Sequence, residues 1–266
     1  SLYGGHKNYT SYASDETAVI EAYNSMNTYG NHTFSVADGA APVDLKITGG
    51  MAGSTTSYTI SKTGAGTMQI TSSSSVDFKT FALSAGRLLA DTAPGSALGK
   101  MPITVAGGAT LGGTGFIGGV SGYTSANVSV AGASGNPAVV APGTVDPVTG
   151  DHVIGTLTVG SGAQANNVTF GANSALKIGF DTNGNCDKLA VNGTLSLDAA
   201  TDKLVLDIAD YAALKAGTYT LATFTALATP GTVFDVVEKP TSGTLQYTAT
   251  SIEYVVHPKT TVLVVK

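Results

Sequence analysis

The side chains whose spacing best suits acid–base chemistry are Asp146, Asp151 and His152. The two aspartates flank a Pro-Val-Thr-Gly turn, and the histidine follows directly. A glycosidase needs two carboxylates brought together over a groove, whereas the other carboxylates of this chain are scattered along it. We therefore expect a long solvated turn at 146–152, and the sequence predicts no catalytic residue.

A second group of polar side chains lies in the segment DTNGNCD at 181–187. Asp181, Asn183, Asn185 and Asp187 carry oxygens at alternate positions around Gly184, and a hard cation such as calcium prefers several oxygen ligands on a tight turn. The bidentate glutamate of an EF-hand is absent from the segment. The alternatives are a weak calcium loop and a plain Asn-Gly turn; we expect the turn, with no metal and no cofactor.

Other chemical signatures are incomplete. His6, His32 and His257 lack zinc-ligand spacing. The segment GGTGFIGG at 112–119 imitates a nucleotide-binding loop but lacks the Lys-Ser/Thr pair and a following helix pattern. Cys186 is the single cysteine, so no internal disulfide forms, and we expect an inert thiol in a turn. The sequence does not predict an enzyme.

Composition limits the class of protein. The 266 residues include 34 glycines, only 12% are charged, and the formal net charge is −5. Mean hydropathy is +0.19, so the chain lacks the polar, highly charged composition of a disordered protein. No basic patch for nucleic acid and no apolar run long enough to span a membrane is present.

Short apolar strands separated by Gly, Asn and Ser turns run through most of the chain, as in residues 105–119 and 154–163. This texture is typical of a stack of coils, and its uneven spacing indicates a degenerate solenoid. The predicted strands are Val43–Ile47, Tyr58–Ile60, Thr67–Ile70, Ile103–Val105, Val128–Val130, Thr156–Val159, Asn167–Phe170, Leu176–Phe180, Lys188–Val191, Thr194–Leu197 and Leu204–Ile208. The side chains predicted to line one continuous core are Leu111, Ile117, Leu157, Val159, Leu176, Ile178, Leu189, Val191, Leu195 and Leu197.

We expect three parts in this all-β chain: an N-terminal cap or docking arm (1–35), a β-helix (36–208) and a β-rich C-terminal cap with a short helix (209–266). The first part holds five of the eleven tyrosines, and Asp15 to Met26 has the spacing of a short amphipathic helix. The short C-terminal helix is predicted at 209–216. Residues 260–265 are predicted to form a low-charge strand, which would tend to associate with other strands if it were an exposed sheet edge.

Four motifs occur in a fixed order between Tyr58 and Gly119. They are Lys62, Gly64, Gly66 and Thr67, then Gly86 and Leu88, then Ala-Leu-Gly at 97–99, then VAGGATLGGTGFIGG at 105–119. In this order they resemble the autotransporter-associated β-strand repeat. The segments 141–144, 154–160, 186–197 and 216–224 are similar to the region that follows the last repeat in such proteins.

The resemblance implies a right-handed parallel β-helix that is secreted or held on the cell surface of a Gram-negative-type bacterium. It lends no catalytic residue, because the family is defined by architecture. The middle of the repeat departs from the pattern, since SSSSVDFKTFAL stands at 72–83 in place of a Thr/Gly-rich phrase. No membrane-barrel segment follows within the chain, so we expect a released passenger or a secreted relative with its own anchoring.

The expected function is structural. A solenoid carries unpaired backbone at both ends, and a copy that completes the sheet of the next gives a head-to-tail contact that does not close, hence a filament or surface layer. The expected partner is therefore the chain itself. The predicted interface residues are Tyr3, Tyr9, Tyr12, Tyr23, Tyr29, Tyr247, Tyr254, Val262 and Val264.

Two alternatives remain open at this point. The first is a monomeric adhesin or glycan-binding module whose exposed Tyr and Asn side chains contact surface glycans. The second, less favoured, is a β-helical polysaccharide lyase or hydrolase. Nucleic acid is not an expected partner, because the chain carries no basic footprint.

Overall fold

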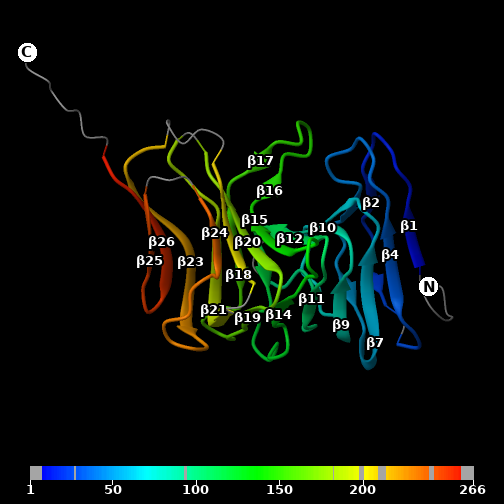
Figure 1. Ribbon diagram of the computed structural model, residues 1–266. Helices are drawn as coiled ribbons and strands as arrows, with labels where there is room; N and C mark the ends of the chain where they lie inside the picture. Colours follow the sequence, from blue (N-terminus) through cyan, green and yellow to red (C-terminus); the bar gives the residue numbers. More distant parts are fainter. Residues whose placement is uncertain are drawn as a thin grey trace, which may run out of the picture.

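A computed structural model of the chain describes residues 8–26, 28–92, 95–181, 183–197, 201–208, 214–239 and 243–258, with only the backbone described at Val236. Within these ranges the protein is all-β, and it contains no helix that could cross a membrane. Strands that alternate along the chain stack into two long parallel sheets, so the architecture is a parallel β-helix (Figure 1). The predicted fold class is confirmed.

The first sheet has thirteen strands and runs from one end of the molecule to the other (Figure 1). In spatial order its strands are β1 (Asn8–Ser11), β4 (His32–Val36), β7 (Ser54–Thr63), β9 (Asp77–Leu83), β11 (Ile103–Val105), β14 (Val128–Val130), β19 (Val168–Phe170), β21 (Lys188–Leu197), β23 (Gly217–Leu227), β26 (Ser251–Val256) and β25 (Thr244–Tyr247). Off this path, β13 (Phe116–Ile117) pairs with β18 (Thr156–Val159), which also pairs with β21.

The second sheet has nine strands, and two short pairs complete the fold. The nine-stranded sheet runs β2 (Ala18–Ile20), β5 (Leu45–Ile47), β8 (Thr67–Ile70), β10 (Gly86–Ala90), β12 (Ala109–Gly113), β15 (Ala138–Pro142), β20 (Ser174–Gly179), β22 (Lys203–Asp207) and β24 (Val236–Glu238). The short pairs are the parallel β3 (Asn24–Ser25) with β6 (Met51–Ala52), and the antiparallel hairpin β16 (Thr144–Val145) with β17 (His152–Val153).

The core lies between the sheets and is built from in-register ladders. Side chains alternate between the two faces of a strand, so every second residue points inward. One such ladder passes through β8, β10, β12, β15, β20 and β22; it comprises Met68, Leu88, Leu111, Val140, Leu176 and Leu204. All ten side chains predicted to point inward are buried in one continuous cluster, which confirms that prediction.

The strand predictions are largely confirmed. β8, β11, β14 and β18 have the predicted bounds to the residue. Two segments predicted as separate strands, Lys188–Val191 and Thr194–Leu197, form the single strand β21, whose register with β23 shifts between Val191 and Thr194.

The helix predicted from Asp15 to Met26 is wrong, because this segment contains β2 and β3. β2 pairs in parallel with β5, and β3 with β6, so residues 8–26 form a first coil of the stack. The apolar residues have the spacing of a helix, but Val19 and Ile20 of β2 are β-branched and favour a strand. Pairing with β5 at the open edge of the sheet stabilises that strand. Residues 209–213 of the second predicted helix and the predicted strand at 260–265 lie outside the described residues.

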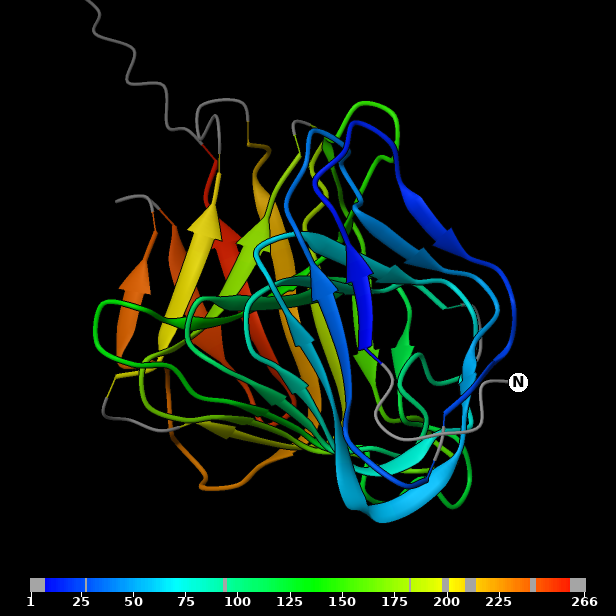
Figure 2. The ribbon, with the colours of Figure 1, turned by 90° about the vertical axis from the view of Figure 1, so that its right-hand side faces the viewer.

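The two ends of the stack differ. At the first end, β1 and β2 begin their sheets, and both run parallel to the strands they pair with. At the other end, β26 and β25 are antiparallel to their neighbours, whereas β24 continues the parallel order of the nine-stranded sheet. Viewed from the β1 end, the coils lie one behind another (Figure 2).

The coils differ in length, as the uneven spacing predicted. Met68 pairs with Leu88 in the next coil, whereas Val140 pairs with Leu176, which lies farther along the sequence from its partner than Leu88 does from Met68. The longer coil contains the β16–β17 hairpin, which leaves the stack and returns. Parallel pairing fixes the positions of the strands but not the length of the segments between them. The extra residues of the longer coil therefore lie between its strands.

Lys62 is a fully buried lysine within an inward ladder. It lies between Phe34 and Leu83 in the first sheet. Its Nζ donates hydrogen bonds to the carbonyl oxygens of Gly64 (2.7 Å), Gly66 (2.5 Å) and Ala85 (2.9 Å). Burial lowers the pKa of Lys62 from 10.5 to about 8, with Asp44 and Asp38 opposing that shift. The lysine thus satisfies carbonyl groups where the chain turns between strands.

Truncation of the ladder residue Leu111 to alanine is expected to lower the free energy of unfolding by about 2–5 kcal/mol. Leu111 is fully buried between Leu88 and Val140, so alanine leaves a cavity that the paired strands cannot close. Urea unfolding followed by circular dichroism measures the change. The control Ser129→Ala, at an exposed position of β14, is expected to stay within about 0.5 kcal/mol of wild type.

The second prediction concerns Lys62 and pH. Between pH 8 and 10.5 the unfolded chain still holds the lysine proton that the folded protein has lost. The free energy of unfolding of wild type relative to Lys62→Met should therefore rise with pH across this window, by at most about 1.4 kcal/mol per pH unit. Urea titrations at several pH values measure the difference, in which the other titrating groups cancel. A pH-independent difference would show that Lys62 titrates normally.

Candidate functional site

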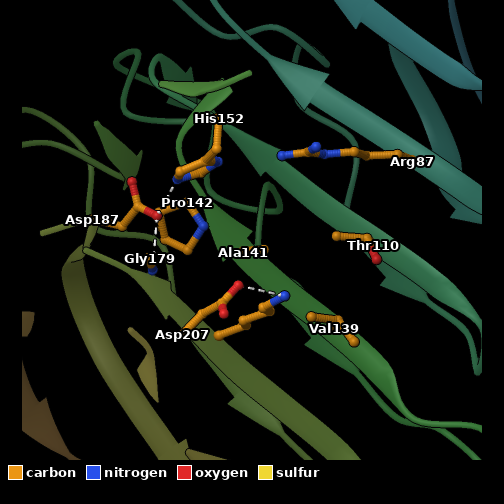
Figure 3. Close-up of a pocket in the computed structure, with 10 residues that line it drawn as sticks. Arg87, Thr110, Val139, Ala141, Pro142, His152, Gly179, Asp187 and Asp207 are labelled. Carbon is orange, nitrogen blue, oxygen red and sulfur yellow. Dashed lines mark hydrogen bonds and ion pairs between the residues drawn. The ribbon is translucent and has the colours of Figure 1, made fainter. Parts of the chain in front are cut away.

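A cleft of about 480 Å³ lies on the outer face of the nine-stranded sheet (Figure 3). Arg87, Thr110, Val139 and Lys177 line it from successive strands β10, β12, β15 and β20. These residues alternate with buried core residues, so their side chains point away from the core. The cleft is therefore a feature of the surface of the rod and not a gap in its interior.

The β16–β17 hairpin borders the cleft and is held onto the sheet at its start. Leu89 points outward from β10 but is fully buried, because Val145 of β16 and Val43 pack on it. Thr144 Oγ1 donates a hydrogen bond of 2.5 Å to Asp91 Oδ2. An outward leucine in the sheet thus gives the hairpin an apolar anchor beside a polar one.

Asp187 fixes the other end of the hairpin. Its carboxylate accepts hydrogen bonds from the backbone N–H of Gly155 (2.9 Å) and of Gly179 (3.0 Å), and lies 2.7 Å from His152 Nε2. The side chain of Asp187 is 1% exposed, and that of His152 is 39% exposed toward the cleft. Since a carboxylate only accepts, His152 donates through Nε2, which leaves Nδ1 as its second polar atom.

The remaining charged groups of the cleft differ in how they are paired. Lys177 and Asp207 form an ion pair of 2.8 Å, and both side chains are about half exposed. Arg87 has a buried Nε that no described residue accepts from. Burial lowers the pKa of the Arg87 guanidinium, while the charges of Asp91 and Asp187 oppose that shift. An arginine nevertheless stays protonated in proteins.

Asp146 and Asp151 do not share bonding partners with His152 in the structure. Asp146 Oδ1 accepts hydrogen bonds from the backbone N–H of Thr149 (2.9 Å) and Val148 (2.8 Å), which lower the pKa of this exposed carboxyl. Asp151 is exposed, and its backbone oxygen accepts from Asp146. The two aspartates thus shape the tip of the hairpin, while His152 pairs with Asp187 instead.

Of the four candidate calcium ligands, Asp181 is hydrogen-bonded to Asn183 and Asn185, whereas Asp187 has other partners. Asp181 accepts hydrogen bonds from the backbone of Asn183 and from the backbone and side chain of Asn185, at 2.7–2.9 Å. Asp187 points into the cleft region toward His152. Across the described part of the chain, no group of three or more His, Cys, Asp or Glu side chains is arranged to hold a metal ion. The neighbouring Cys186 is half-buried, and burial raises the pKa of its thiol to about 12.

The predicted interface residues that the structure describes fall into two groups. Tyr12, Tyr23 and Tyr29 are strongly exposed, at 81%, 60% and 78%, and Val19 of β2 is exposed beside them in sequence. Tyr9, Tyr247 and Tyr254 are directed into the subunit: Tyr9 stacks on Phe34, Tyr247 is half-buried, and Tyr254 is fully buried. Tyr3, Val262 and Val264 lie outside the described residues.

Sequence reasoning missed the His152–Asp187 pair and the position of Arg87. The pair joins residues 35 positions apart, and no motif links them. Arg87 lies between two positions of the repeat motif, Gly86 and Leu88, but a single arginine in the sequence does not indicate a cleft. No protein-family model matches the chain, and no curated protein matches it either.

Substitution of Asp187 by alanine is expected to cost at least about 2 kcal/mol of the free energy of unfolding, because two backbone N–H groups lose their acceptor. Urea unfolding measures the cost. The control Asp151→Ala removes an exposed carboxylate of the same hairpin and should change stability by less than about 0.5 kcal/mol. Equal stability of the two variants would contradict an anchoring role for Asp187.

Proposed function

We propose that this protein is an extracellular structural component whose β-helical rods assemble head to tail. The supporting observation is the first coil, whose strands β1 and β2 stand at the start of both sheets. A sheet edge presents backbone groups that can pair with a further strand. Tyr12, Val19 and Tyr23 of the same coil, and Tyr29 shortly after it, are exposed and offer apolar surface that a neighbouring copy could cover.

The opposite end of the rod supplies a complementary edge. β24 ends the nine-stranded sheet in the parallel order, so β2 of a second copy would continue that order. Such a contact joins two different surfaces and does not close on itself, so it extends into a filament. A stable contact of this kind buries about 1,000 Å² or more in total.

The proposed location rests on the resemblance of residues 58–119 to the autotransporter-associated β-strand repeat. Several motif positions have structural roles that any coil of this type would need. Lys62 binds the carbonyl oxygens of Gly64 and Gly66, and Gly86 has a left-handed φ of 67° where a Cβ would lie 2.3 Å from Lys62 Nζ. We propose on this basis that the protein is located outside the cell, on or near a Gram-negative-type surface.

The test uses a lysine on the edge strand. Val19→Lys puts a charge at an exposed position of β2, which should block strand addition without disturbing the core. In sedimentation velocity and negative-stain images, wild type should form concentration-dependent filaments, and Val19→Lys should remain a 26.5 kDa monomer. Val148→Lys, at an exposed valine of the β16–β17 hairpin, is the matched control and should assemble like wild type.

The alternative is a monomeric adhesin or glycan-binding module, which the cleft beside the hairpin favours. A wild-type protein that stays monomeric at high concentration would overturn the structural proposal in favour of this one. Equal assembly of wild type and Val19→Lys would show that β2 is not the contact.

A further inference from the structure

The cleft beside the hairpin is lined by Arg87, whose Nε has no acceptor among the described residues. We propose that it binds a carboxylate-bearing sugar, such as the uronic acid unit of an acidic polysaccharide, with the carboxylate on Arg87. The guanidinium points into the cleft, toward the side from which His152 comes (Figure 3). Its Nε is buried and has no acceptor among the described residues. A guanidinium offers a planar fork of donors that matches a carboxylate with two parallel hydrogen bonds.

The nearby aspartates are already engaged elsewhere. Asp91 accepts from Gln69 (2.8 Å), from Thr144 and from the backbone N–H of Thr114 (2.7 Å). Asp187 accepts from two backbone N–H groups and from His152. Among the described residues neither carboxylate makes a hydrogen bond to Arg87, so the end of the guanidinium that lines the cleft remains available to an anion from outside.

The rest of the cleft suits a sugar ring. Val139, Ala141 and Pro142 give a small apolar floor on β15, on which the C–H face of a pyranose ring can pack (Figure 3). The ion pair of Lys177 and Asp207 supplies a donor and an acceptor for ring hydroxyl groups. The volume, about 480 Å³, lies in the range of small-ligand sites, roughly 300–1,000 Å³.

The charge pattern favours a monoanion. The lining contains Arg87 and Lys177 as cations and Asp187 and Asp207 as anions, and among these four Arg87 is the one with no ion pair or side-chain hydrogen bond to a described residue. One carboxylate would add a single negative charge to a lining whose two cations and two anions already balance, and Arg87 would hold it by hydrogen bonds. A phosphate dianion would place a second negative charge near Asp187 and Asp207, which opposes its binding.

The test is calorimetric titration of the full chain with oligogalacturonate, compared with the neutral galactose oligomer, acetate and inorganic phosphate. We expect the uronate to bind roughly tenfold or more tightly than each of the other probes. Arg87→Gln should weaken uronate binding by a similar factor. Lys203→Gln, which removes a cation from the same sheet face outside the cleft, should bind like wild type.

A second variant keeps the test decisive if Arg87→Gln folds poorly. Thr110 is paired with Arg87 across β12 and β10, so Thr110→Glu would place a carboxylate beside the guanidinium. This variant should retain or gain thermal stability and lose uronate binding. Failure of wild type to bind uronate, equal binding of any comparison probe, or unchanged binding by both cleft variants would overturn the proposal. The outcome is independent of assembly, because Val19→Lys can serve as a monomeric background.

Discussion

The structure depends on the in-register stacking of inward side chains along a parallel β-helix. Each coil contributes one residue to a ladder, as Leu111 does between Leu88 and Val140, so every inward position is constrained by two neighbours. In a close-packed core, removing or adding even one methylene group there lowers the stability of the fold. Variation is therefore confined to the outward positions and to the segments between strands, and any functional site must lie on the outside of the rod.

The same stacking creates a second requirement where the chain turns between strands. Backbone groups at these places leave the ladders and still need partners. Buried polar side chains meet this need: Lys62 binds three carbonyl oxygens, Asp44 accepts from the N–H groups of Gly39 and Thr67, and Asn166 bonds Gly119 and Tyr123. Three of the aspartates singled out for possible chemistry, Asp146, Asp181 and Asp187, likewise accept hydrogen bonds from backbone N–H groups.

The sequence predicted the strands and the core well, because alternation along one strand is a local property. It failed at Asp15 to Met26, where helical spacing was overruled by pairing with β5 and β6, a contact between distant segments. The cleft was unpredictable for the same reason. Arg87 and Thr110 are neighbours only through the register of β10 and β12, and His152 meets Asp187 only because the inserted hairpin folds back.

The hairpin links architecture to function. It lengthens one coil, leaves the ladders intact, and is tied down at its start through Thr144 and Asp91 and at its end through His152 and Asp187. A loop fixed at both ends on a rigid sheet keeps its side chains in place before a ligand arrives, so binding loses little conformational entropy. The stacked coils supply the floor, the hairpin supplies one wall, and Arg87 lies between them with an Nε that no described residue accepts from.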